Sequence, residues 1–344
     1  MRAITLQPGD SIADSEISSV VITEDIKFGD RRIRKGHRLS ADDVPLLADL
    51  DRPVHAVFLE SGDVHEDDAG GRLASAVAGP GLAIRGPSFS RYNLIANTKG
   101  LLRVDGERLL RLNRLPGVAI FTLEDRIPVV PGKIVTGVKV TPVAVAEATL
   151  LEAEAIAAES PVMQIVPFQP LRVGVISTEG PDWRVRDRFQ ASVAQKIGWY
   201  GGSVIGFSDL ARDADVIAAE IDRLEGEGAD LVLAAGGNTI DPLDPTLRAL
   251  DVAGADIVRF GAPAHPGSMF WLAYRGALPI FNLASCSMFS KATIADVVLP
   301  WIMTGERVEA DTLAGLGFGG LLDRGMSFRF PPYDVDGVEE TGEE

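Results

Sequence analysis

The second half of the chain alternates between short, mainly apolar runs and segments in which apolar residues have helical spacing. The runs at 171–176, 203–207 and 231–234 predict strands that are buried on both faces of a parallel sheet. Between them, apolar residues three and four positions apart predict helices at 187–197 and 213–224. The pattern continues with helices at 245–250 and 293–303 and strands at 256–260, 269–274 and 278–282. This alternation predicts an α/β domain over 166–330, with a mostly parallel sheet flanked by helices.

The first half has the pattern of an α+β, β-rich region. Over 1–60, a β-hairpin and helix region is predicted from strands at 20–23, 27–28, 31–34 and 54–59 and a helix at 41–50. Over 61–165, whose role is unknown, we expect helices at 67–78 and 144–158 and strands at 82–86, 100–104 and 118–123. We also expect helical or turn-like segments at 91–98 and 105–113, and hairpin strands across 127–146. Prolines between 161 and 170 place the domain boundary there. Residues 331–344 are expected to form an acidic, disordered tail.

The strand at 231–234 runs into a loop with the composition of an anion site. Gly236 and Gly237 let the backbone take positive φ and approach a ligand closely. Short polar and acidic side chains follow, before a helix whose first N–H groups have no intrahelical partner. These residues are Asn238, Thr239, Asp241 and Asp244. The alternative is a glycine turn that ends the strand, with Asp244 as the helix N-cap.

Composition limits the classes of partner. The chain has 344 residues, a net charge of −16 and an isoelectric point of about 4.7. An acidic surface argues against nucleic acid and anionic membrane, so a phosphate ligand would need a local site. Cys286 is the single cysteine, which excludes an intrachain disulfide. The N-terminus has no signal-peptide pattern, and no apolar run is long enough to span a bilayer, so a cytoplasmic location is expected.

The order of loops in the second half resembles the molybdopterin-binding domain shared by molybdopterin adenylyltransferases and molybdopterin molybdotransferases. The resemblance covers about residues 171 to 304 and rests on four stretches: VGVISTEG, AAGGNTIDPLD, PGSM and FNLASCSMFS. The hairpin and helix GDRRIRKGHRLSADDVPLLADL also looks like a β element of the molybdotransferases. Taken together, both halves are most similar to the molybdopterin-binding portion that some bacteria fuse to a nucleotidyltransferase domain.

This resemblance implies a set of site residues and several departures from the family pattern. Asp244 keeps the position of a functional aspartate, whereas Ser268 replaces a phosphate-pairing lysine and Asp241 replaces a glycine. Asp241 and Asp244 are implied as catalytic residues or as ligands of a divalent cation. The implied cofactor-binding residues are Thr178, Glu179, Asp187, Gly236, Gly237, Asn238, Thr239, Pro266, Gly267, Ser268, Ser285 and Cys286. For Cys286, a packed thiol is the alternative.

Three functions remain open at this point. The first is a molybdenum cofactor biosynthesis protein, a transferase that binds molybdopterin or its nucleotide form and acts in adenylylation or metal insertion. The second is a non-catalytic carrier or chaperone that delivers molybdopterin to a client molybdoenzyme. The third is an unrelated nucleotide-binding α/β enzyme that shares only the glycine loop. Magnesium or molybdate would be a further ligand under the first, and the resemblance also implies a homo-oligomer.

Overall fold

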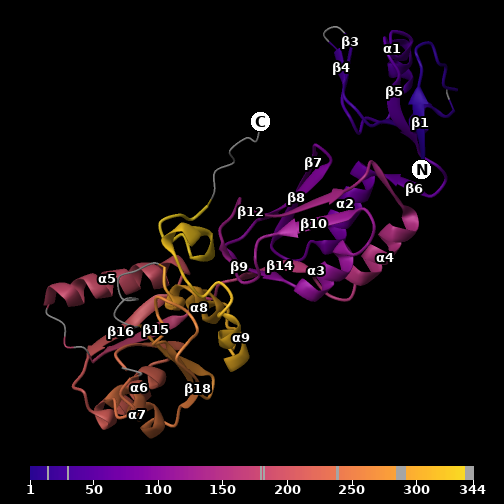
Figure 1. Ribbon diagram of the computed structural model, residues 1–344. Coiled ribbons are helices and arrows are strands. Elements are labelled where there is room, and N and C mark those ends of the chain that lie inside the picture. Colours follow the sequence, from indigo (N-terminus) through magenta and orange to yellow (C-terminus); the bar gives the residue numbers. More distant parts are fainter. Residues whose placement is uncertain are drawn as a thin grey trace. The chain divides into compact units, whose positions relative to one another are not determined.

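A computed structural model describes residues 1–13, 15–28, 31–178, 180, 183–237, 240–283 and 292–337 (Figure 1). The chain divides into two compact units. Unit 1 consists of 1–97, 103–125 and 132–165, and unit 2 consists of 98–102, 126–131 and 166–344. In the part of the chain that the structure describes, no helix has both the length and the apolar character needed to cross a membrane.

Unit 1 begins with a small antiparallel sheet. Its strands follow the order β1 (Arg2–Leu6), β5 (Val54–Phe58) and β2 (Val20–Ile22). The strands β3 (Ile26–Phe28) and β4 (Arg31–Ile33) pair as a hairpin, which confirms the hairpin expected there. The short helical elements are η1 (Ile17–Ser19), η2 (Ala41–Asp43) and α1 (Val44–Ala48). Ile22, Leu39 and Val54 belong to the core beneath them.

The larger sheet of unit 1 is antiparallel and packs against helices. Its order is β10 (Val118–Thr122), β12 (Ile134–Val140), β8 (Arg91–Ala96) and β7 (Leu82–Ser88). The helix α2 (Glu66–Val77) packs on β12, β8 and β7, and α4 (Glu147–Ala157) lies beside it. The helix α3 (Gly106–Asn113) packs against α4 and β10. The strands β6 (Asp63–His65) and β13 (Ala144–Ala146) form a separate pair.

One expectation for the first half was wrong. The segment 91–98 was expected to be helical or turn-like, but it contains the inner strand β8, which pairs Leu94 with Ile84 and Tyr92 with Val138. Its polar residues hide the strand pattern, and only one of its partners is close in sequence, since β7 forms a hairpin with it whereas β12 lies far along the chain. The segment near 161–170, where the domain boundary was expected, contains strand β14 (Met163–Pro167), which forms a sheet with β9 (Gly100–Val104) and β11 (Pro128–Val129). The division between the two units falls within this segment, between residues 165 and 166.

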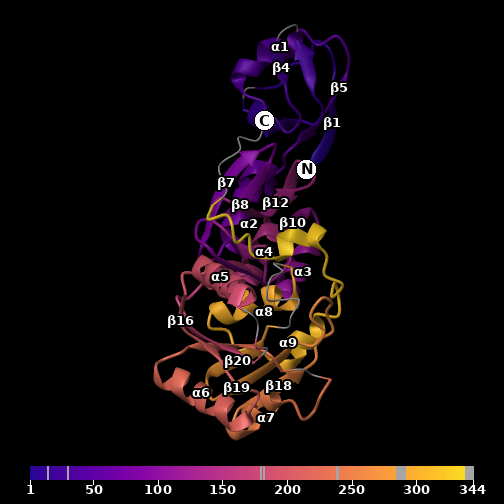
Figure 2. The same ribbon diagram turned by 90° about the vertical axis from the view of Figure 1, so that its left-hand side faces the viewer.

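Unit 2 has a six-stranded sheet, which confirms the mostly parallel α/β fold (Figure 2). The order is β16 (Ser203–Asp209), β15 (Arg172–Ser177), β17 (Leu231–Ala235), β20 (Leu278–Asn282), β19 (Trp271–Arg275) and β18 (Asp256–Phe260). The first four strands are parallel. Strand β19 is antiparallel to both of its neighbours, so β18 again runs in the direction of β20.

Helices cover both faces of this sheet. Val175 and Leu233 face α5 (Trp183–Trp199) and α8 (Ile294–Met303), in one apolar core. Ile176 and Val232 belong to a second core with α6 (Ala214–Gly226) and α7 (Pro245–Val252). Burial on both faces is the reason that the strands read as mainly apolar runs in the sequence.

The chain continues after α8 with α9 (Ala310–Gly315) and η3 (Arg324–Arg329). Tyr333, which lies in the tail expected to be disordered, is only 6% exposed and belongs to the main core of unit 2. The expectation was therefore wrong for Tyr333, because its ring packs on Trp199 at the end of α5 and on Tyr200 just after it, which the local composition does not reveal. Residues 338–344 lie outside the described ranges.

Candidate functional site

The carboxyl ends of several strands meet along one edge of the sheet in unit 2. Strands β16, β15, β17, β20 and β18 all run in the same direction, so the segments that follow them leave the sheet at this edge. In open α/β sheets, ligands bind outside this carboxyl edge. The predicted residues Thr178, Gly236 and Gly267 lie in the segments after β15, β17 and β18.

Thr178 and Gly236 are in direct contact. The Thr178 N–H donates to the Ala235 carbonyl at 3.0 Å, and the Thr178 hydroxyl lies 3.3 Å from the hydroxyl of Thr246. A Cβ atom at Gly236 would lie only 2.1 Å from Thr178 Oγ1. Glycine is therefore required at 236, where φ is +151°, and the close approach expected of the glycine pair is observed between two neighbouring loops.

Gly237 is fixed against the next strands by Trp271. The indole N–H of Trp271 donates to the Gly237 carbonyl at 3.3 Å, and a Cβ at Gly237 would lie 2.5 Å from that nitrogen. Asn282 completes the connection, because its Oδ1 accepts from the Trp271 N–H at 2.8 Å and its Nδ2 donates to the Met269 carbonyl at 3.0 Å. Sequence reasoning missed both side chains; the only signal for Asn282 was an amide at the end of an apolar strand.

The loop with Pro266 and Gly267 rests on the start of α8. The Ile294 N–H donates to the Pro266 carbonyl at 3.3 Å. Gly267 has φ +114°, and a Cβ there would lie 2.4 Å from Ile294 Cγ2. Ser268 is exposed, and its carbonyl accepts from the Ala262 N–H at 3.0 Å. The backbone of this loop is thus tied to α8, while the Ser268 side chain faces solvent.

Asp244 caps helix α7 and holds an arginine. One carboxylate oxygen accepts from the Thr246 N–H at 2.8 Å, and the other accepts from Arg212 at 2.9 Å. Asp244 is only 2% exposed, whereas the Arg212 side chain is 55% exposed. The alternative interpretation of Asp244 as an N-cap is confirmed. Its catalytic role stays a prediction, because both oxygens already have partners.

Asp241 forms a local turn, in which its Oδ1 accepts from the Leu243 N–H at 2.9 Å. No group of three or more histidine, cysteine, aspartate or glutamate side chains could hold a metal ion within the described ranges. Metal ligation by Asp241 and Asp244 therefore stays a prediction, and the described side chains supply no third ligand for the ion.

Two arginines and a buried hydroxyl give this edge groups that suit an anion. Arg186, near the start of α5, pairs with Asp209 at the end of β16 at 3.0 Å, and its side chain is 41% exposed. Arg212 lies in the segment after β16. The hydroxyl of Ser177, at the end of β15, is buried and has no hydrogen-bond partner among the described residues. Each of these groups can donate hydrogen bonds to an acceptor-rich ligand such as a phosphate.

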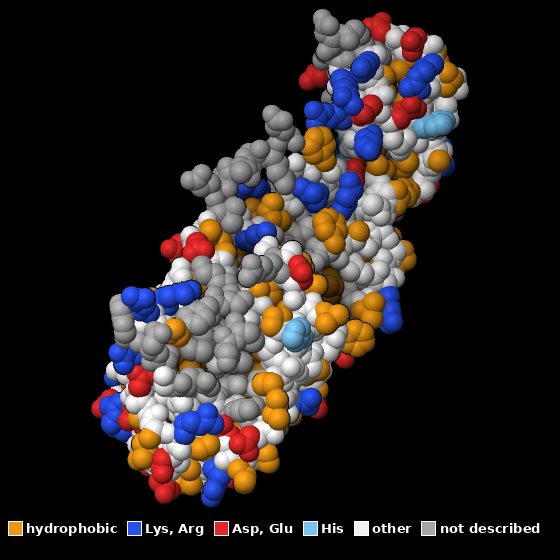
Figure 3. Space-filling view, turned by 60° about the vertical axis from the view of Figure 1, so that its left-hand side comes forward, with side chains coloured by type: hydrophobic (Ala, Val, Ile, Leu, Met, Phe, Trp, Pro, Cys, Tyr) orange, Lys and Arg blue, Asp and Glu red, His pale blue; other side chains and the backbone are white. Residues whose placement is uncertain are grey.

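Acidic, basic and apolar side chains are interspersed over the coloured surface of unit 2 in Figure 3. An anion at the carboxyl edge would therefore depend on the local groups just described, as the net charge of the chain requires.

Several predicted residues are not brought into this arrangement by the structure. Asp187 is exposed on α5. Five other predicted residues lie outside the described ranges: Glu179, Asn238, Thr239, Ser285 and Cys286.

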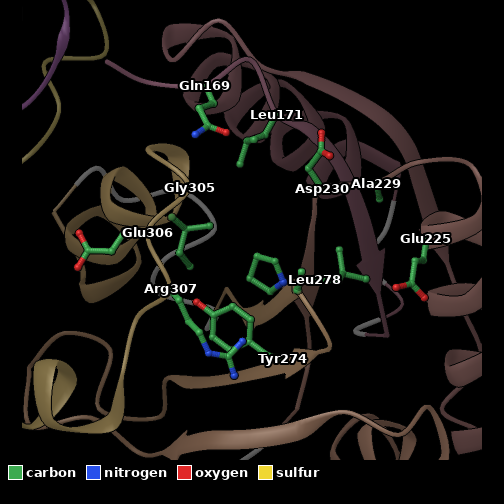
Figure 4. Close-up of a pocket in the computed structure, with 13 residues that line it drawn as sticks. Gln169, Leu171, Glu225, Ala229, Asp230, Tyr274, Leu278, Gly305, Glu306 and Arg307 are labelled. Atoms are coloured by element: carbon green, nitrogen blue, oxygen red, sulfur yellow. The ribbon is translucent and has the colours of Figure 1, made fainter. Parts of the chain in front are cut away.

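A pocket of about 470 Å³ lies at the opposite edge of the same sheet (Figure 4). Leu171, Asp230 and Leu278, which line it, stand at the amino ends of β15, β17 and β20. Two of its carboxylates have cationic partners, since Glu306 pairs with Arg126 at 2.5 Å and Glu225 pairs with Arg275 at 3.1 Å. Figure 4 shows the Glu306 carboxylate directed away from the space between Gln169 and Tyr274. This pocket is separate from the carboxyl-edge loops.

No protein-family model matches the sequence, and no curated protein matches it. Solved structures do match. A CinA protein of unknown function from Thermoplasma acidophilum is 14% identical with a TM-score of 0.28, over 34% of this chain and 89% of that one. The molybdopterin biosynthesis Mog protein from Mycobacterium ulcerans is 16% identical with a TM-score of 0.25, over 34% of this chain and 84% of that one. A molybdopterin biosynthesis MoeA protein from Pyrococcus horikosii is 13% identical with a TM-score of 0.27, over 64% of this chain and 74% of that one. At these TM-scores the likeness assigns neither a family nor a function.

Proposed function

We propose that the carboxyl edge of unit 2 binds molybdopterin through its phosphate and that the chain acts in molybdenum cofactor biosynthesis. The observation that carries the proposal is the convergence of the segments after β15, β17 and β18. Thr178 contacts Gly236, Gly237 is bonded to Trp271, and Asn282 ties Trp271 to Met269. These are the loops whose order in the sequence resembles the molybdopterin-binding domain.

The arginines at this edge offset the loss of the lysine that Ser268 replaces. Arg212 is held by the buried carboxylate of Asp244 and exposes half of its side chain. Arg186 is held by Asp209, whose side chain is 33% exposed. A guanidinium group can donate two parallel hydrogen bonds to phosphate, which a serine hydroxyl cannot. Asp244 then serves the anion indirectly, because it orients a cation.

The step in the pathway is proposed as adenylylation or metal insertion, with a carrier function as the second candidate. The carrier function is favoured by Asp244, whose two oxygens are engaged with Thr246 and Arg212 and are not directed at a substrate. Incubation of the loaded protein with Mg²⁺ and ATP, or with molybdate, distinguishes the two candidates. Adenylylated or metal-loaded molybdopterin supports the catalyst, whereas unchanged molybdopterin that passes to an apo-molybdoenzyme supports the carrier.

Binding itself is tested with molybdopterin released from a purified molybdoenzyme. We expect the Arg212→Met and Arg186→Met variants to bind it about tenfold more weakly, because each loses a charge-assisted hydrogen bond. Arg275→Met is the matched control, since Arg275 lies at the opposite edge and pairs with Glu225. Equal affinity in all four proteins would contradict the proposal. Binding of ATP or GTP in preference to molybdopterin would instead establish the nucleotide-binding enzyme.

A further inference from the structure

The last described segment of the chain ends on a buried charged cluster in unit 2. The Tyr333 hydroxyl donates to Asp296 Oδ1 at 2.9 Å, and Lys196 Nζ donates to the same oxygen at 2.6 Å. The side chains of Lys196 and Asp296 are 5% and 1% exposed. Such a pair is sensitive to the loss of either partner, because an unpaired charge would then stay buried.

The segment around Tyr333 is held along α5. The Trp199 indole N–H donates to the Val335 carbonyl at 2.9 Å, and Gln195 Nε2 donates to Asp334 Oδ1 at 2.8 Å. The rings of Tyr333 and Trp199 pack with their centroids 5.9 Å apart. These contacts fix where the Tyr333 hydroxyl lies with respect to the cluster.

Asp296 connects this cluster to the start of α8. Its Oδ2 accepts from the Thr293 hydroxyl at 2.8 Å and from the Thr293 N–H at 3.1 Å, which forms a capping box. Lys196 and Tyr333 occupy the other oxygen, so hydrogen bonds on both oxygens hold the carboxylate in one orientation.

The first residue of α8 contacts the candidate site. The Ile294 side chain packs against Gly267, and its N–H donates to the Pro266 carbonyl at 3.3 Å. A continuous set of contacts therefore runs from Tyr333 and Lys196 through Asp296 and Thr293 to the loop that contains Gly267.

We propose that Tyr333 and Lys196 are positioning residues of the carboxyl-edge site. They hold Asp296, and Asp296 fixes the start of α8, on which the Pro266–Gly267 loop rests. The C-terminal segment thereby sets the geometry of a loop more than sixty residues earlier in the chain. The effect on ligand binding rests on the proposed function, whereas the effect on the loop does not.

The first experiment measures hydrogen exchange by mass spectrometry on the full-length chain, without any ligand. Tyr333→Phe keeps the packed ring and removes the hydroxyl. We expect the amides of 293–297 and 264–270 to exchange about fivefold faster, the effect of one lost hydrogen bond. The matched control is Tyr200→Phe, because the Tyr200 hydroxyl lies 3.5 Å from that of Tyr333, whereas it is Tyr333 that donates to the Asp296 carboxylate.

Two results would overturn the inference. One is unchanged exchange in both segments of Tyr333→Phe. The other is an equal acceleration in these segments and in strand β15, because a uniform change would show only a loss of global stability. The amides of the same two segments should also exchange faster in Lys196→Arg, which keeps the charge but changes the donor geometry.

The second experiment measures molybdopterin affinity in Tyr333→Phe and Tyr200→Phe. We expect about fivefold weaker binding in Tyr333→Phe alone, with the number of binding sites unchanged. If the wild-type protein binds no molybdopterin but the exchange result holds, the proposed function fails and the positioning role stands. If affinity falls in Tyr333→Phe without local exchange changes, the positioning role is contradicted.

Discussion

Glu66 illustrates how one buried side chain sets a pH dependence. It starts helix α2 in unit 1 and is 6% exposed. Burial raises the pKa of this carboxyl above its usual value of 4.5, although a hydrogen bond with Ser90 and the charge of Lys139 act in the opposite direction. The folded protein therefore holds this proton more tightly than the unfolded chain does. The ionised side chain costs free energy of folding above the folded-state pKa.

We expect Glu66→Gln to raise the free energy of unfolding at neutral pH. As pH rises from 4.5 through the raised pKa, the wild type loses stability that the neutral amide keeps. The difference between the two proteins should vanish on acidification below 4.5, where both side chains are neutral in either state. Urea unfolding followed by far-ultraviolet circular dichroism over this pH range measures the difference.

Glu24→Gln provides a comparison of opposite sign. A hydrogen bond from Arg52 lowers the pKa of Glu24 to about 2, so its charged form favours the folded state. The stability from this pair is present above the usual pKa and is lost as pH falls towards 2. At neutral pH the Glu24 variant should be less stable than the wild type while the Glu66 variant is more stable. Shifts of the same sign would contradict the assignment.

At the scale of elements, the sequence predicted most of unit 2 but not what holds its loops. Strand β17 and its glycine pair could be predicted, because an apolar run followed by two glycines is a local signal. The bond between Trp271 and Gly237 could not, since β19 looks like any other apolar strand and its antiparallel direction depends on a pairing with β20. Arg212 and Arg186 were missed because their partners, Asp244 and Asp209, lie far from them in the sequence.

A glycine series in unit 2 separates backbone strain from steric contact. Gly237 has φ +82° and would place a Cβ 2.5 Å from Trp271, whereas Gly254 has φ +67° with open space around it. Gly226, at the end of α6, has open space and no positive φ. We expect Gly237→Ala to cost about 2–4 kcal/mol, Gly254→Ala about 1 kcal/mol, and Gly226→Ala to be neutral or stabilising by up to about 1 kcal/mol.

Urea unfolding followed by tryptophan fluorescence measures all three variants, because the chain's four tryptophans belong to unit 2. Equal losses for Gly237→Ala and Gly254→Ala would show that Trp271 does not confine the glycine loop. The close contact between Gly237 and Trp271 in the candidate site would then be wrong.

At the scale of the whole molecule, the division into units does not follow a single boundary in the sequence. Residues 98–102 and 126–131 belong to unit 2, although segments of unit 1 surround them in the chain. Prolines near 161–170 gave a local signal for a boundary, but hydrophobic periodicity carries no information about contacts between residues far apart in the chain. Lys99 bonds to the Trp199 carbonyl at 3.0 Å and also pairs with Asp336, which illustrates such contacts.

Arg126 makes this organisation testable. Its guanidinium lies 5.0 Å from the ring centroid of Trp301 and pairs with Glu306 at 2.5 Å, where both side chains are largely buried. Because these partners lie in unit 2, Arg126→Met should lower the stability reported by tryptophan fluorescence by about 1–2 kcal/mol. Arg111→Met is the control, since Arg111 pairs with Glu159 inside unit 1 and should leave this transition unchanged. If both variants shift the tryptophan transition equally, the chain unfolds as one cooperative body. If neither variant shifts the transition, Arg126 does not contribute to the stability of unit 2, and its assignment to that unit is wrong.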